Sequence, residues 1–136
     1  MADIVKMTPA QLVAELEKFS GTLHYYKVTI VHPRVVATDG VKFLIDNAKA
    51  SWLAETIARA LMREEEMFVN EGFSVWTLTV HGNKGLLVAD DGNGNVLYIE
   101  DCLEIDFPLE KIKLYAGLNE MEDGKNQHVI FVPSEY

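Results

Sequence analysis

The stretch from Phe73 to Val80, with the sequence FSVWTLTV, decides the fold. Aromatic and β-branched residues alternate along it with a period of two, which is typical of a half-buried strand. We predict that this strand opens an antiparallel sheet in the second half of the chain. One of its faces carries Trp76, Leu78 and Val80, and the other carries Phe73, Val75, Thr77 and Thr79.

The residues after this strand predict more strands separated by turns. The segment from Asp90 to Asn95, DDGNGN, is the strongest turn signal in the chain, because Gly and Asn both tolerate positive φ. Asp101 interrupts an otherwise apolar face, which indicates a bulge or an edge position. Pro108 ends the strand that contains Asp101. The predicted strands cover residues 86–89, 96–107, 112–116 and 128–132.

The first half of the chain predicts helices that cover this sheet. Residues 8–11, TPAQ, form a capping box with Pro at the first helical position, and Ser20-Gly21 is predicted to end that helix. A second helix is predicted over residues 38–48, capped by Thr38 or Asp39. The apolar residues of segment 51–68 recur at helical spacing, which predicts a third helix. Strand-like composition is found at residues 23–31 and 35–38.

These elements together indicate an α+β fold. We expect about a five-stranded antiparallel β-meander with three helices packed on one face, and room for one or two N-terminal strands. With 136 residues, of which 49% are apolar, the chain is predicted to be a single domain spanning residues 1–136. Residues 1–7 are expected to form a flexible N-terminal end.

The charge balance bears on possible partners. Twenty-one acidic residues against twelve basic ones give a formal net charge of −9. This argues against direct binding of nucleic acid, whose affinity depends on Lys and Arg. Such a surface either keeps a protein soluble or mimics nucleic acid in the basic groove of another protein. Cys102 is the one cysteine, which excludes an internal disulfide. We expect a cytoplasmic location and no membrane contact.

Several short motifs follow one another in a fixed order along the chain. They are FSGT at residues 19–22 with YY at 25–26, TDGVKFL at 38–44, WL at 52–53, FxxWxLxV at 73–80, DGNGN at 91–95, DFPL at 106–109 and PSEY at 133–136. As a set they resemble an uncharacterised family of small bacterial proteins, also found on phages and plasmids and known as a domain of unknown function. The resemblance covers residues 19–136 and implies a single-domain accessory protein of a mobile element. It implies no particular chemistry.

Common catalytic and metal-binding patterns do not fit the sequence. A calcium loop starting at Asp91 would need Gly where Val96 stands and Glu where Cys102 stands. Asp101 should raise the pKa of the Cys102 thiol, which argues against a nucleophile. The histidines lack the helical spacing of a zinc motif. These four histidines are His24, His32, His81 and His128. We therefore expect no catalytic residue, no metal and no cofactor.

One polar cluster is a candidate binding site, composed of Tyr25, Tyr26, Asp39 and Lys42. In the simplest interpretation Asp39 caps the helix that it begins. In the functional interpretation the exposed start of that helix and the two tyrosines bind an anion or a side chain of a partner.

Our preferred hypothesis is a non-enzymatic, acidic accessory protein of a phage or mobile element. It would bind a host protein that has a basic nucleic-acid-binding groove, as an anti-CRISPR-like inhibitor of a defence complex. One alternative is a cryptic enzyme or small-ligand binder with a site near Tyr25, Tyr26 and Asp39. Another is a self-assembling structural protein, a homo-oligomer that pairs through a free sheet edge.

Overall fold

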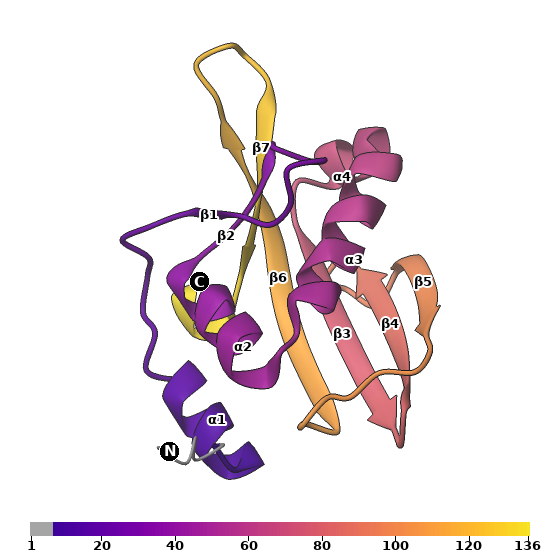
Figure 1. The fold of residues 1–136 in the computed structure, drawn as a ribbon. Helices are drawn as coiled ribbons and strands as arrows, with labels where there is room; N and C mark the ends of the chain where they lie inside the picture. The colour runs from indigo at the N-terminus through magenta and orange to yellow at the C-terminus, as the bar shows by residue number, and fades with distance from the viewer. Residues whose placement is uncertain (1–6) are drawn as a thin grey trace.

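The strand β3 (Ser74–His81) lies inside the sheet, between two other strands, as shown by a computed structural model that describes residues 7–136 (Figure 1). It pairs antiparallel with β4 (Lys84–Asp90) on one side and with β6 (Lys111–Glu120) on the other. Trp76, Leu78 and Val80 are buried, whereas the residues between them are partly exposed. The alternation predicted for this strand is confirmed.

The sheet contains the five predicted strands and two N-terminal strands, for which the prediction left room, but its strands are ordered differently. Residues 7–136 form one seven-stranded sheet with the order β1-β2-β7-β6-β3-β4-β5. The β2 strand runs parallel to β7, and all other neighbours are antiparallel. The α+β class is confirmed, but the five-stranded antiparallel meander is not. The remaining strands are β1 (Tyr26–Lys27), β2 (Val35–Ala37), β5 (Val96–Cys102) and β7 (Asn126–Phe131).

The sheet departs from a meander at β6. This strand pairs with the free edge of β3 and not with the free edge of β5. The connection of residues 103–110 therefore runs from β5 at the outside of the sheet back across β4 and β3 to the start of β6 (Figure 1). Alternating apolar residues identify strands, but they do not identify neighbours.

Residues 7–136 contain four α-helices, whereas three were predicted. The capping box is confirmed, because Gln11 N donates to Thr8 Oγ1 at 3.1 Å and Thr8 N donates to Gln11 Oε1 at 2.9 Å. This first helix ends at Leu16, before the predicted end at Ser20-Gly21, because the hydrogen bonds of the next residues change to the tighter i→i−3 pattern, as from Lys18 N to Glu15 O. The helices are α1 (Pro9–Leu16), α2 (Asp39–Ala48), α3 (Ser51–Arg63) and α4 (Glu65–Glu71).

The helix predicted over residues 51–68 is two helices in the structure. Glu64 leaves the helical conformation, with φ −112° and ψ 37°, and separates α3 from α4. The change of direction lets Phe68 of α4 pack on the indole of Trp76, with ring centroids 5.4 Å apart. It also lets Glu65 reach side chains of β7 and of the loop before β2. Tertiary contacts therefore override the continuous helical pattern.

Two predicted strands are shorter than expected. In segment 23–31 only β1 pairs with another strand, and Leu23 and Ile30 are 89% and 90% exposed. Strand propensity alone does not form a strand where no neighbour is available. The 96–107 segment forms a strand only to Cys102, because Glu104 takes a left-handed conformation with φ 55°. The edge position suggested by Asp101 is confirmed, since β5 is the last strand of the sheet.

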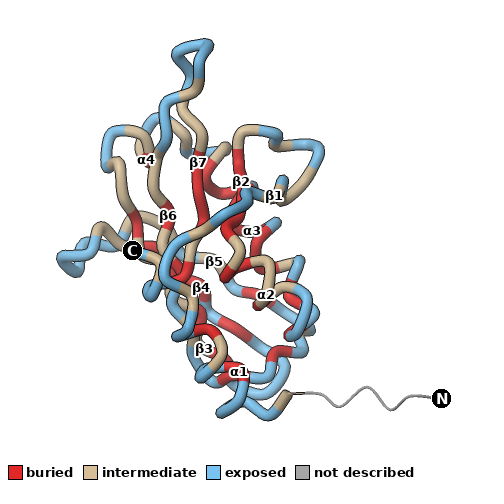
Figure 2. Tube along the Cα trace, turned by 90° about the vertical axis from the view of Figure 1, so that its left-hand side faces the viewer, coloured by how far each residue is buried: buried red, intermediate tan, exposed pale blue. Residues whose placement is uncertain are grey.

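The core lies between one face of the sheet and the helices, and in Figure 2 its residues form the red segments of the trace. It includes Trp76, Leu78 and Leu114 from the sheet and Leu53 and Ile57 from α3. The predicted flexible end at residues 1–7 lies outside the described residues except for Met7. The side chain of Met7 packs partly buried against the core.

Candidate functional site

A hollow of about 880 Å³, here called the acidic cleft, lies between α2, α3 and the segment from β5 to Pro108. Apolar side chains and carboxylates both line it. Among the described residues that line the cleft, Lys49 is the one with a basic side chain. Its apolar part includes Leu12, Trp52, Cys102 and Ile105, and its carboxylates include Asp46, Glu100, Glu104 and Asp106.

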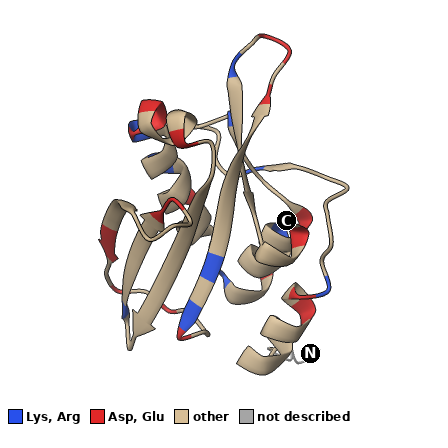
Figure 3. Ribbon diagram, turned by 180° about the vertical axis from the view of Figure 1, so that it is seen from behind, with Lys and Arg blue, Asp and Glu red and all other residues tan. Residues whose placement is uncertain are grey.

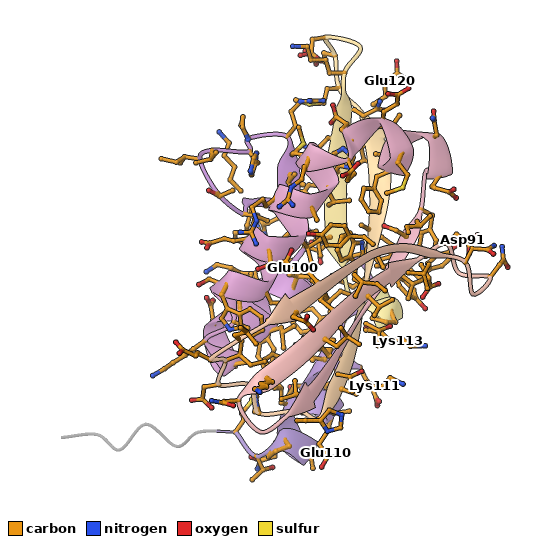
Figure 4. All side chains as sticks on the ribbon, turned by 90° about the vertical axis from the view of Figure 1, so that its right-hand side faces the viewer. Asp91, Glu100, Glu110, Lys111, Lys113 and Glu120 are labelled. Carbon is orange, nitrogen blue, oxygen red and sulfur yellow. The ribbon has the colours of Figure 1, made fainter. Side chains whose placement is uncertain are left out.

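The carboxylate of Glu100 is held in place by two neighbours. Glu100 lies on the side of β5 that faces the helices (Figure 4), where its Oε2 accepts a hydrogen bond from Arg59 Nη2 of α3 at 3.0 Å. The Tyr98 hydroxyl donates to the other carboxylate oxygen. Burial, together with this bond to Glu100, raises the pKa of Tyr98. Glu100 is therefore a fixed negative group along the cleft.

The connection after β5 forms the rim of the cleft. Its turn depends on the left-handed Glu104, and the Ile105 N–H donates to Asn83 O at 2.9 Å, which anchors the connection to the β3–β4 turn. Leu103 beside it is 66% exposed. A left-handed residue other than Gly, Asn or Asp is uncommon and costs backbone energy. The rim thus combines exposed apolar surface with acidic side chains.

The negative charge of the cleft is only partly neutralised within the chain. Asp46 pairs with Lys42 at 2.8 Å, and Glu100 pairs with Arg59. Within residues 7–136, Glu104 and Asp106 form no ion pair. The rim therefore keeps uncompensated negative charge next to an apolar floor.

Three of the four residues predicted as a site lie together. The Lys42 Nζ lies 5.8 Å from the centre of the Tyr26 ring, a cation–π distance. The backbone N–H of Leu23 donates to Asp39 Oδ2 at 2.8 Å. This hydrogen bond, with others from Tyr26 and Thr22, lowers the pKa of Asp39. Burial, together with the bond to Asp39, raises the pKa of Tyr26. The three side chains mainly anchor segment 22–27 to α2.

Tyr25 differs from the other three, since it is 54% exposed. It lines a hollow of about 470 Å³ together with Tyr26 and Lys42, and Asp39 is not part of the lining. The four residues thus do not converge on one point, and their role in binding stays a prediction.

The start of α2 is occupied by a carboxylate of the chain itself. Glu135 accepts hydrogen bonds from Thr38 Oγ1 at 2.6 Å, from Gly40 N at 3.2 Å and from Val132 N at 2.9 Å. A carboxylate at this position satisfies backbone donors of the first helical turn. The helix start proposed as an anion site therefore already holds an anion, the carboxylate of Glu135. This residue lies 97 and 95 positions after Thr38 and Gly40 in the sequence.

A comparison with protein-family models decides the family. The model described as "Family of unknown function (DUF6876)" matches residues 10–136. The chain belongs to DUF6876. The predicted resemblance to an uncharacterised family is thereby confirmed. Searches of the curated proteins and of the solved structures give no match.

The chain also contains a partly buried ionic cluster that the sequence did not indicate. His128 of β7 is 1% exposed, and its Nε2 lies 3.1 Å from Glu65 Oε2 of α4. Arg34 Nη2 donates to Glu65 Oε1 at 2.9 Å, and Arg34 Nη1 donates to Asn126 O at 3.2 Å. Burial would raise the pKa of Glu65, but the bonds from Arg34 and His128 outweigh burial and lower it. The cluster joins α4 to the sheet.

Another reactive side chain of this protein is Cys102, which is buried on β5. Burial raises the pKa of its thiol, and the neighbouring Glu100 raises it further. Within residues 7–136 no group of three or more His, Cys, Asp or Glu side chains is placed to hold a metal ion. None of the helices in the described part of the chain is long and apolar enough to cross a membrane.

Proposed function

We propose that this chain is a non-enzymatic binding protein of a phage or mobile element, which holds a basic segment of a host protein in the acidic cleft. The observation that supports the proposal is the combination of Glu100, Glu104 and Asp106 with an apolar floor in one hollow. Lys and Arg side chains carry apolar stems and charged ends, so they match both parts of such a surface.

The size of the hollow favours a protein segment over a single ion. About 880 Å³ accommodates several side chains, and Leu103 adds exposed apolar area at the rim. Uncompensated charge at Glu104 and Asp106 would speed association with a basic partner and make binding sensitive to salt.

The same charge pattern supports a more specific proposal about the partner. A net charge of −9 suits a groove that normally holds the phosphate backbone of a nucleic acid. We therefore propose that the partner is a nucleic-acid-binding defence complex of the host, and that this chain competes with the nucleic acid. Asp and Glu would stand in for the phosphates.

The experiment is capture of partners from a host lysate with the whole chain as bait. One variant carries Glu104→Lys and Asp106→Lys in the cleft. A matched variant carries Glu120→Lys at the end of β6 and Glu122→Lys in the following turn, which changes the formal charge equally. The wild-type chain and the turn variant should retain one stoichiometric nucleic-acid-binding protein at about 50 mM salt and release it at about 500 mM salt. The cleft variant should retain about tenfold less.

A second step tests the competition. Adding the nucleic acid that the captured protein binds should displace it from the bait. The proposal fails if the captured protein remains bound in excess nucleic acid, or if the cleft and turn variants lose binding equally. It also fails if no stoichiometric partner is retained at low salt.

A further inference from the structure

The half of the sheet farthest from β1 has an exposed face opposite the helices, here called the open face. It consists of side chains from β3, β4, β5 and β6 that point away from the core. Leu86 and Ile99 are 42% and 59% exposed on it, and Lys111 and Lys113 are exposed as well. Figure 4 shows both lysines on the side of the sheet away from the helices. The open face comprises Thr77, Thr79, Leu86, Val88, Ile99, Asp101, Lys111 and Lys113.

The register of the strands arranges these side chains in two rows across the sheet. Residues that pair directly in antiparallel strands point to the same face. The first row therefore reads Lys111, Thr79, Leu86, Asp101, and the second reads Lys113, Thr77, Val88, Ile99. Positive charge lies on β6 at one side and negative charge lies on β5 at the other, with apolar and Thr side chains between them.

The side chain of Asp101 points to the open face, although the residue also borders the acidic cleft. The neighbouring Glu100 bonds to Arg59 of α3, and Cys102 is buried in the core, so both point toward the helices. Successive side chains of a strand alternate between faces, which places the exposed Asp101 on the opposite face.

This arrangement is self-complementary. A two-fold axis that runs nearly parallel to the strands, between β3 and β4, places β6 of one copy over β5 of another and β3 over β4. Because such an axis preserves the rows, Lys111 then faces Asp101 of the second copy, and this ion pair forms twice. In the same way Thr79 faces Leu86 and Lys113 faces Ile99, whose apolar surface accepts a lysine stem.

We infer that the open face binds a second copy of this chain, and that the two sheets pack face to face as a symmetric sandwich. Sheets in such sandwiches lie about 10 Å apart with strands nearly aligned. Within residues 7–136 neither Lys111 nor Lys113 forms an ion pair, so both are available for the second copy. This contact differs from pairing at a sheet edge, since it uses side chains and no backbone groups.

The contact is small, and this determines how it should behave. Four strands about 4.8 Å apart, with two rows of side chains about 7 Å apart, give roughly 260 Å² of sheet per copy. A standard stable interface uses about 800 Å² per partner. The dimer should therefore dissociate on dilution and at high salt. The acidic cleft lies on the helix side of β5, so the proposed partner and the second copy can bind together.

Sedimentation velocity of the whole chain tests the inference, at concentrations from about 5 to about 500 μM and low salt. The wild-type chain should pass from monomer to dimer over this range. Either Lys111→Glu or Asp101→Lys should raise the dimer dissociation constant about tenfold, because each places like charges opposite each other twice. Lys125→Glu and Glu122→Lys at the β6–β7 turn are the matched controls and should leave the constant unchanged.

Mixing the two single variants gives the decisive result. In a mixed pair the new carboxylate at position 111 faces the new amine at position 101, and the unchanged Asp101 faces the unchanged Lys111. The mixture should therefore form dimers that neither variant forms alone, which also shows that both variants are folded. A wild-type chain that stays monomeric up to about 500 μM, or a mixture that fails to associate more strongly than its components, would overturn the inference.

Discussion

At the scale of single residues, the C-terminal Glu135 acts as the cap of α2. It replaces the cap expected from Thr38 or Asp39, since neither side chain bonds to the backbone of the first helical turn. The hydroxyl of Thr38 instead donates to Glu135, and Asp39 accepts from Leu23. Gly40 is required at this place, because an added Cβ would lie 2.7 Å from Glu135 Oε1 and 2.7 Å from Val132 Cγ2.

Removing this cap should destabilise the fold. Glu135→Ala loses three hydrogen bonds to a charged acceptor, and we expect it to lower the free energy of unfolding by about 1–3 kcal/mol. Gly40→Ala should cost a similar amount, because its methyl group displaces the carboxylate. Urea denaturation of both variants and of the double variant measures the loss in the free energy of unfolding. The loss in the double variant should be smaller than the sum of the losses in the two single variants. Fully additive losses would contradict a contact between Gly40 and Glu135.

The buried His128 predicts a dependence of stability on pH. Burial holds the pKa of His128 below its usual range, although Glu65 partly opposes this shift and Arg34 adds to it. In the unfolded chain His128 therefore takes up a proton near pH 6.5, whereas in the folded chain it stays neutral at that pH. The free energy of unfolding therefore falls as the pH decreases below about 6.5. The lowered pKa of Glu65 gives a further loss of stability below about pH 4.5.

The control for this prediction is His128→Gln, which keeps a polar side chain but cannot titrate. Between about pH 7.5 and about pH 5.5 the free energy of unfolding should fall more steeply for the wild-type chain than for the variant. Equal slopes in urea denaturation at the two pH values would show that His128 does not titrate on unfolding.

At the scale of elements, the end of β5 shapes the cleft, and a left-handed residue decides where that strand ends. Glu104→Gly should be more stable than Glu104→Ala by about 1 kcal/mol, since only Gly takes this conformation without a steric cost. Thermal unfolding of the two variants provides the comparison. If Ala is as stable as Gly at position 104, the backbone conformation described for this turn is wrong.

The elements also show what the sequence could predict. The β3 alternation, the capping box at Thr8 and the Asp90–Asn95 turn follow from local preferences, and all three are found. The separation of α3 from α4, the position of β6 beside β3 and the parallel pairing of β2 with β7 depend on distant contacts. No periodicity in the sequence encodes those contacts.

The same distinction applies to the candidate site. Tyr26, Asp39 and Lys42 were found because they flank one predicted helix start. The acidic cleft was missed, because Asp46 and Glu100 to Asp106 are far apart in the chain and form no motif. The one signal in the sequence was the excess of acidic residues, which gave the sign of the charge but not its place.

At the scale of the whole molecule, the two sides of the sheet differ in charge. The open face carries both lysines and Asp101, whereas the cleft on the helix side is mainly acidic. Seen from behind in Figure 3, the lower part of β6 carries a blue stretch of lysine, whereas carboxylates lie along the cleft on the helix side. We propose two contacts for these two surfaces, a basic partner for the cleft and a second copy for the open face. The proposed basic partner and the proposed second copy would thus bind to different surfaces of one acidic protein.

The acidic cleft as the binding surface for a host protein is the central claim, and hydrogen–deuterium exchange of the chain with and without its captured partner tests it most directly. We expect the partner to slow exchange in residues 100–108 and in the facing parts of α2 and α3, and to leave the β6–β7 turn unchanged. Slower exchange confined to other segments, with residues 100–108 unaffected, would contradict the claim.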